Sequence, residues 1–251
     1  MSETPGARQV ALVTGASRGI GRATAIELAR QGYDLVLNYL RNVKEAEETL
    51  RLVQAQGAQG WLVAANIGEP DEVKTLFAEV RAHPPLAVVV HNAALGTFKN
   101  LLHIRPNQLE LAFRVNVFAL LWLAREAAPL MREQGGKIIA VSSLGSQRVV
   151  PYYGIVGPSK AALEAMMRYL AFELRPQGII VNAVSGGLID TDALRAFPQW
   201  EGMAEEAITR TPAGRLGRAE DIARTIGALV EGKMDWVCGQ VILADGGVTL
   251  T

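Results

Sequence analysis

Seven short apolar runs recur along the chain, and longer segments with helical periodicity separate them. We predict β-strands at residues 10–14, 34–38, 60–64, 86–91, 137–142, 179–184 and 240–244, and helices at about 19–31, 43–56, 71–82, 106–133, 158–174 and 219–231. The runs are nearly continuous in apolar residues, which is typical of strands covered on both faces. Alternating strands and helices favour parallel pairing through right-handed crossovers. The sequence therefore predicts an α/β fold, a doubly wound seven-stranded parallel sheet with helices on both faces.

The chain has 251 residues, 49% of them hydrophobic and 20% charged, which allows a large buried core. No low-complexity linker divides it, so we predict a single domain over residues 1–251. One segment, about 188–217, breaks the alternation of strands and helices with prolines, glycines and a tryptophan. Long excursions of this kind often form lids or binding loops, although a surface insertion without a role is the alternative.

The composition excludes several classes of protein. Twenty-five basic and twenty-five acidic residues balance, which argues against nucleic acid or an anionic membrane as a partner. A single cysteine, Cys238, fits a reducing compartment, and the polar N-terminus lacks the apolar stretch of a signal peptide. We therefore expect a cytoplasmic protein. The three histidines do not have the spacing of metal ligands, so no metal site is expected.

A glycine-rich stretch, TGASRGIG (14–21), lies between the first predicted strand and the first predicted helix. Glycines at 15, 19 and 21 allow a tight turn and a close approach of the backbone to a phosphate group, at which the amides of the helix N-terminus then point. At this place in the chain the pattern predicts a Rossmann dinucleotide-binding site.

The end of the second predicted strand indicates which dinucleotide is bound. An NAD site usually has a carboxylate there, but this chain reads Leu37-Asn38-Tyr39-Leu40-Arg41. Arg41, and Arg18 inside the glycine turn, could pair with the 2′-phosphate of NADPH. Alternatively, both arginines are solvated surface charges. The missing acid favours NADPH as the cofactor.

Two tyrosines precede Lys160 in the stretch PYYGIVGPSK (151–160). At about 100° per residue, position 153 lies within about 20° of Lys160 around a helix and position 152 about 80° away. Val156, which lies about one turn before Lys160, has no proton to give. Tyr153 is therefore the tyrosine best placed to act with Lys160, and it must fold back if the helix begins after it.

These motifs, with His91-Asn92-Ala93-Ala94, Asn116 in FRVNVF, VSSLGS and NAVSGGLIDT, resemble the short-chain dehydrogenase/reductase family over essentially the whole chain. Most members have the catalytic tyrosine four residues before the lysine, whereas the enoyl-acyl-carrier-protein reductases have it seven before, as in Tyr153 and Lys160. The type III enoyl-acyl-carrier-protein reductases are the most similar branch. The resemblance implies NADPH-dependent reduction of trans-2-enoyl thioesters on acyl carrier protein, in fatty acid synthesis, by a homotetramer.

The resemblance also implies roles for individual residues. Tyr153 would bind the thioester carbonyl oxygen, while Lys160 would bind the nicotinamide ribose and lower the pKa of the phenol. Ser143 would be the catalytic serine, with Ser142 as a close competitor, and Asn116 would hold a water chain behind the lysine. The positions that match the family's cofactor site are Gly15, Ser17, Arg18, Gly19, Ile20, Gly21, Asn38, Arg41, Asn66, Ile67, Asn92, Ala93, Ala94, Lys160, Gly187, Ile189 and Thr191. The chain departs from the family pattern at His91, Asn66 and Gly186.

Phe197, Trp200 and Met203 in the 188–217 segment would form the apolar wall for an acyl chain, under a lid at 190–215. Alternatively, these side chains pack the segment onto the body. Apolar residues around the helices at 106–133 and 158–174, and the C-terminal tail, could supply interfaces between copies. Two other functions stay open: a 3-oxoacyl or other carbonyl reductase, and a catalytically silent NADPH-binding protein.

Overall fold

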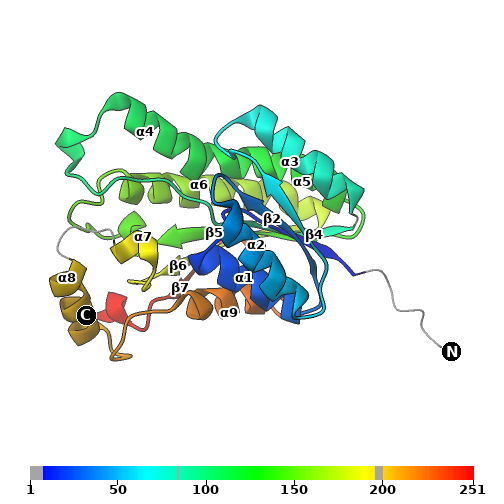
Figure 1. Cartoon of the computed structure of the whole chain (residues 1–251). Coiled ribbons are helices and arrows are strands. Elements are labelled where there is room, and N and C mark those ends of the chain that lie inside the picture. Colours follow the sequence, from blue (N-terminus) through cyan, green and yellow to red (C-terminus); the bar gives the residue numbers. More distant parts are fainter. Residues whose placement is uncertain (1–7, 84, 196–199) are drawn as a thin grey trace.

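A computed structural model describes residues 8–83, 85–195 and 200–251 (Figure 1). Its seven parallel strands form one sheet in the order β3-β2-β1-β4-β5-β6-β7. They are β1 Val10–Val13, β2 Asp34–Tyr39, β3 Gly60–Ala64, β4 Leu86–His91, β5 Gly136–Ser143, β6 Ile179–Gly186 and β7 Val241–Ala244. All seven predicted strands are confirmed, each within two residues of its predicted ends. The strand order reverses between β1 and β4, and ligands of doubly wound sheets bind at such a switch point.

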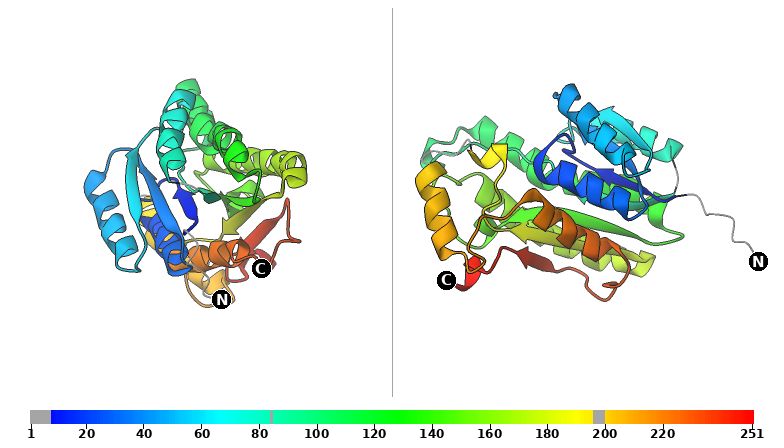
Figure 2. Two further views of the ribbon diagram at one scale, coloured as in Figure 1. Left: turned by 90° about the vertical axis from the view of Figure 1, so that its right-hand side faces the viewer. Right: turned by 60° about the horizontal axis from the view of Figure 1, so that its bottom comes forward.

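Helices cover both faces of this sheet, as the two views in Figure 2 show. The helices are α1 Gly19–Arg30, α2 Val43–Gln54, α3 Pro70–Ala82, α4 Pro106–Phe113, α5 Ala119–Met131, α6 Val156–Leu174, α7 Asp192–Arg195, α8 Trp200–Arg210 and α9 Ala219–Val230. Buried residues of α3, α5 and α6 share one core cluster, and those of α1, α2 and α9 share the other. Neighbouring residues of one strand enter opposite clusters, Leu12 the first and Val13 the second. The predicted fold is therefore confirmed.

The predicted helix at 106–133 is interrupted by one turn of π-helix, Arg114–Phe118, between α4 and α5. Single π turns inside helices are frequent at functional sites, since the added residue changes which side chains face inward. Here Asn116 lies in the π turn and is fully buried.

The 188–217 segment leaves the sheet after β6 and returns close to where it left. The Asp190 amide donates to the Gly217 carbonyl at 2.8 Å, and the Gly217 amide donates to the Leu188 carbonyl at 2.9 Å. Between these two points lie α7 and α8, and α8 is beside the C-terminus in Figure 1. Within the described ranges, no helix has both the length and the apolar character required to cross a membrane.

Candidate active site

The glycine-rich turn joins β1 to α1 at the switch point of the sheet. Gly15 has a φ of +63°, and a Cβ on Gly21 would lie only 2.2 Å from the Gly15 carbonyl oxygen. No side chain caps the first turn of α1, and no acidic residue lies in that turn. Its amides are therefore available to an anion, and a dinucleotide pyrophosphate fits this turn.

Asn92, directly after β4, holds the glycine turn from the neighbouring strand. Its Nδ2 donates to the Thr14 carbonyl at 2.9 Å and to the Gly15 carbonyl at 3.1 Å. The Thr14 hydroxyl accepts hydrogen bonds from the amides of Asn92 and Ala93, at 3.0 and 3.1 Å. The side chain of Asn92 thus holds the backbone of the glycine turn in place. Ala94, two residues after Asn92, is exposed.

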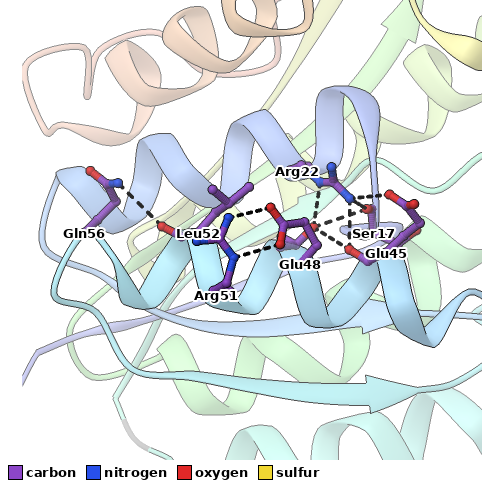
Figure 3. A network of polar contacts seen from close by, with 8 residues as sticks. Ser17, Arg22, Glu45, Glu48, Arg51, Leu52 and Gln56 are labelled. Carbon is purple, nitrogen blue, oxygen red and sulfur yellow. Dashed lines mark hydrogen bonds and ion pairs between the residues drawn. The ribbon is translucent and has the colours of Figure 1, made fainter.

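Arg22 supports the same turn from α1 (Figure 3). Its guanidinium donates to the Ser17 carbonyl at 2.6 Å, to Glu45 Oε2 at 2.6 Å and to Thr49 Oγ1 at 2.9 Å. Glu45 and Thr49 belong to α2, so this cation links the two helices and fixes the Ser17 backbone. Sequence reasoning missed Arg22 because the contact depends on how α1 packs against α2.

The two arginines expected at the adenosine end of the cofactor have different surroundings from Arg22. Arg18 and Arg41 are exposed, and neither guanidinium has a hydrogen bond or an ion pair within the described residues. Asn38 is buried, and its amide donates to the Ala65 carbonyl at 2.9 Å and accepts from the Gly15 amide at 3.4 Å. Asn38 thus holds the glycine turn through its side chain. Arg18 and Arg41 lie on the surface, facing solvent.

Two residues at the end of β3 were expected beside the cofactor. The Asn66 Oδ1 accepts a hydrogen bond from the Gly68 amide at 3.0 Å, so one side of its amide group is engaged. Ile67 is buried and belongs to the core cluster under α3 and α5. Both residues follow the carboxyl end of β3, and the glycine turn follows the carboxyl end of β1 in the same parallel sheet.

Tyr153 lies just before α6, which begins at Val156. It folds back so that its hydroxyl lies 3.3 Å from the Ser143 Oγ, which donates to it. A Cβ on Gly145 would be 2.5 Å from the Tyr153 ring, so this glycine permits the close contact. The Phe98 ring lies nearly parallel to the Tyr153 ring at a centroid distance of 6.2 Å. The structure therefore brings Ser143 and Tyr153 together.

The two competing residues are directed elsewhere. Tyr152 is exposed, with a φ of +61°, a backbone conformation uncommon for a side chain of this size. The Ser142 hydroxyl donates to Glu164 at 2.5 Å. Val156, at the position where most family members have tyrosine, is buried against Gly96. Ser143 and Tyr153 are thus the pair that faces a common space.

Lys160 is only 4% exposed and donates from Nζ to the Val141 carbonyl at 2.7 Å. Burial lowers its pKa to about 8, and the nearby Glu164 charge opposes that shift. We expected Lys160 to lower the pKa of Tyr153, and that effect stays a prediction. The pKa of Tyr153 is raised because its hydroxyl is buried, an effect that the hydrogen bond from Ser143 opposes in part. Tyr153 is therefore a neutral phenol that can donate a hydrogen bond.

Asn116 and His91 lie behind the lysine. The Asn116 Oδ1 accepts a hydrogen bond from the Leu95 amide at 2.7 Å. Its Nδ2 donates to the Leu95 carbonyl at 2.8 Å and to Ser159 Oγ at 2.9 Å. His91 Nε2 lies 3.2 Å from the Asn116 carbonyl oxygen, to which it donates. Burial, and secondarily the Lys160 charge, lower the pKa of His91 to about 3, so the ring is neutral. His91 therefore bonds to the backbone carbonyl of Asn116, and the water chain expected at Asn116 stays a prediction.

The remaining predicted residues lie in or beside the 188–217 segment. Thr191 approaches the glycine turn, since a Cβ on Gly19 would lie 3.6 Å from its Cγ2. Gly187 and Ile189 line a cavity of about 690 Å³ under α9 and β7, which Ser143, Tyr153 and Lys160 do not line. Trp200 and Met203 are half-buried on α8, and Phe197 lies outside the described residues. Asp190 is paired with Arg195 at 2.8 Å, and the described part of the chain holds no cluster of metal-ligating side chains.

A glycine turn at the switch point, next to a tyrosine, a serine and a buried lysine, is typical of Rossmann-fold oxidoreductases. A family model described as Enoyl-(Acyl carrier protein) reductase matches residues 15–249. The 1-cyclohexenylcarbonyl-CoA reductase of Streptomyces collinus is 41% identical over 99% of this chain and 89% of its own. Versicolorin reductase 1 of Aspergillus parasiticus is 34% identical over 95% of each chain.

Solved structures agree with these relatives. The reductase LugOII, which catalyses keto-reduction at C1 during lugdunomycin biosynthesis, is 31% identical with a TM-score of 0.89 over 98% of this chain and 99% of its own. A 7α-hydroxysteroid dehydrogenase complexed with NADH and 7-oxo glycochenodeoxycholic acid is 28% identical with a TM-score of 0.91, over 96% of this chain and 94% of its own. The chain belongs to the short-chain dehydrogenase/reductase family, whose members here are oxidoreductases that act on carbonyl or enoyl groups.

Proposed function

We propose that this protein reduces trans-2-enoyl thioesters with NADPH. The observation that supports this best is the pairing of Tyr153, seven residues before Lys160, with Ser143, while the position four before the lysine is occupied by a buried valine. The relative from Streptomyces collinus is named for a thioester whose carbonyl is joined to a cyclohexenyl group. That substrate class matches the tyrosine position that the resemblance associates with enoyl reduction.

The chemistry needs hydride delivery to the β-carbon and a proton, taken up from water, for the α-carbon. When bound, the nicotinamide cofactor supplies the hydride. The electron pair of the double bond then moves toward the carbonyl, whose oxygen becomes an enolate oxygen. Tyr153, as a neutral phenol, donates a hydrogen bond to this oxygen, and Ser143 orients the same carbonyl. Lys160, which is buried on α6, supplies a positive charge to the site.

Two features support NADPH rather than NADH. No acidic residue stands between Asn38 and Arg41, where a carboxylate would repel a 2′-phosphate. Arg18 and Arg41 are exposed and free of acidic partners among the described residues, so a phosphate would not have to break an existing ion pair.

Acyl carrier protein is the proposed carrier of the substrate. The segment 95–105 runs beside Tyr153, through a bridge between Lys99 and Tyr153. It carries Lys99, His103 and Arg105, and no acidic residue lies within 93–109 or 143–163. An acidic carrier, or the phosphate of its pantetheine arm, would complement this basic rim. Charge reversal at Lys99 and Arg105 should then raise KM for an enoyl-carrier substrate more than KM for the matching CoA thioester.

A carbonyl reductase is the second candidate function. It is favoured by the solved relative that performs keto-reduction. Assays with NADPH on crotonyl and acetoacetyl thioesters separate the two functions. We expect faster turnover of the crotonyl thioester, and a clear preference for the acetoacetyl thioester would reject the enoyl proposal. NADPH binding without turnover of either substrate would instead support a catalytically silent binding protein.

We also propose that residues 190–215 act as a lid over the substrate. The pairing of Ile189 with Gly217 closes the segment at its base, and a segment of this length after a strand's carboxyl end is typical of a lid over a substrate. Hydrogen exchange with and without NADPH and an enoyl thioester tests this proposal. Ligand-dependent protection of α8 would support the lid, and unchanged protection would indicate that the segment simply packs on the body.

A further inference from the structure

Glu164 is a buried carboxylate in α6, only 5% exposed. Burying a carboxylate costs free energy unless hydrogen bonds or an opposite charge compensate it. Its Oε1 accepts hydrogen bonds from two hydroxyl groups, Ser142 Oγ at 2.5 Å and Ser146 Oγ at 2.6 Å. Such charge-assisted bonds are among the stronger hydrogen bonds in proteins.

The two serines lie on either side of Ser143. Ser142 is in β5, and Ser146 ends the short 3₁₀ turn Leu144–Ser146 that follows. Ser143 caps this turn by accepting the Gly145 amide at 3.3 Å, and Gly145 lies directly under the Tyr153 ring. One carboxylate oxygen therefore ties together the two ends of the turn that carries Ser143 and supports Tyr153.

Glu164 also lies four residues after Lys160, on the same face of α6. Its negative charge favours the protonated lysine and opposes the effect of burial. The neutral His91 on β4 and the phenol of Tyr153 are the other titratable groups that face this region.

The elements packed against α6 bring no competing charge to Lys160. The 3₁₀ turn and β6 have no charged side chain. On the remaining elements the charged residues are Lys137 on β5, Arg114 on the π turn, Glu110 on α4, Arg125 and Glu126 on α5, and the exposed Arg175 on the 3₁₀ turn Arg175–Gln177. Lys137 is paired with Asp235, Arg114 with Glu69 and Glu126 with Arg81, while Glu110 and Arg125 are exposed. Glu164 is thus the acidic group that acts on the lysine.

We propose that Glu164 is a positioning residue for the reduction. It fixes the Ser142–Ser146 turn that orients Ser143 and Tyr153, and it serves as the buried counter-charge that keeps Lys160 protonated. The inference rests on the proposed roles of Ser143, Tyr153 and Lys160. It adds a residue that touches neither substrate nor cofactor and acts through those three.

The test compares E164Q, which removes the charge, with E164D, which keeps it, and with E173Q as the control. Glu173 is exposed on the same helix. Turnover of a crotonyl thioester with NADPH is measured from about pH 6 to pH 10, a range that covers the titration of a perturbed lysine. For E164Q we expect kcat to fall about tenfold, the size of one lost charge-assisted hydrogen bond. We also expect the alkaline limb of its profile of kcat against pH to move down by about one pH unit, because Lys160 would lose its proton at a lower pH.

E164D should lose turnover without moving the alkaline limb, since the charge stays while the carboxylate retracts. E173Q should match the wild type in kcat and in the position of the alkaline limb. If the alkaline limb stays in place in E164Q, whatever its kcat, the proposed role of Glu164 as counter-charge to Lys160 is overturned. If E164Q does not fold, S146A tests the positioning role: kcat should fall with the limb unmoved, and an unchanged kcat would overturn that role.

Failure of the proposed function can be told apart from failure of this inference. If the wild type reduces no thioester, the proposed function has failed. NADPH binding, followed by cofactor fluorescence against pH, then reports on Lys160 without turnover. Binding should weaken at a lower pH in E164Q than in the wild type, and coincident curves would overturn the inference.

Discussion

The Tyr153 hydroxyl and the Ser143 Oγ lie 3.3 Å apart, although one residue precedes α6 and the other ends β5. The contact exists because the chain before α6 folds back over Gly145, which has no side chain to prevent it. Both groups therefore point into the space above the carboxyl ends of the strands, where ligands of doubly wound sheets bind.

Y153F should lose most turnover, because the ring stays while the hydroxyl that donates to the enolate oxygen is removed. Loss of one such donor costs roughly a hundredfold in kcat. NADPH affinity should remain within about twofold of the wild type, since no contact of the glycine turn is touched. Y152F is the matched control, because that side chain is exposed. Equal losses in both variants, measured with a crotonyl thioester, would contradict the assignment of Tyr153.

R41A and R18A should weaken NADPH binding more than NADH binding, since only NADPH carries the additional phosphate. A charge-assisted contact of this kind contributes about 1.5–3 kcal/mol. Fluorescence titration with both dinucleotides measures the ratio of affinities. R51A is the control, because Arg51 is exposed on α2 but already paired with Glu48 at 2.7 Å. If neither R41A nor R18A changes the ratio, the choice of NADPH is wrong.

The buried His91 should make the fold sensitive to acid. Its pKa is about 3 in the folded chain and near 6.5 when unfolded, so the unfolded chain binds the proton more tightly between these values. Stability should therefore be lost as pH falls below about 6.5, by up to about 1.4 kcal/mol per pH unit. Urea unfolding at several pH values should show this slope in the wild type and a flatter one in H91N. Parallel slopes would mean that His91 is not buried as a neutral ring.

Most of the fold could be predicted because strand and helix leave different periodicities in a sequence. Each of the seven apolar runs became a strand, and Gly15 lies in the predicted turn while Gly21 packs against it from the start of α1. The site was harder, since its contacts join distant segments. The π turn at Asn116, the bond from His91 to its carbonyl, and the role of Glu164 depend on packing between β4, β5 and α6. The pKa of Tyr153 could not be predicted from the spacing to Lys160, because burial of the phenol, which raises that pKa, depends on how the chain before α6 folds back over Gly145.

The homotetramer stays a prediction, and two side chains on α6 make it testable. Tyr169 and Phe172 are 73% and 83% exposed on the helix that also carries Lys160. Large apolar groups in such positions are typical of interfaces. Light scattering at micromolar concentration should give the mass of a tetramer, and F172E should give a smaller species. A monomeric wild type would contradict the proposed assembly.

The destination of the transferred hydride tests the central claim most directly. The protein is supplied with NADPH that carries deuterium at the transferable C4 position, together with equal amounts of crotonyl and acetoacetyl thioesters, and the products are analysed by mass spectrometry. Our account predicts deuterium on the β-carbon of a saturated butyryl thioester, and loss of that product in Y153F. Deuterium found only on the carbinol carbon of a 3-hydroxybutyryl thioester would contradict it and identify a carbonyl reductase.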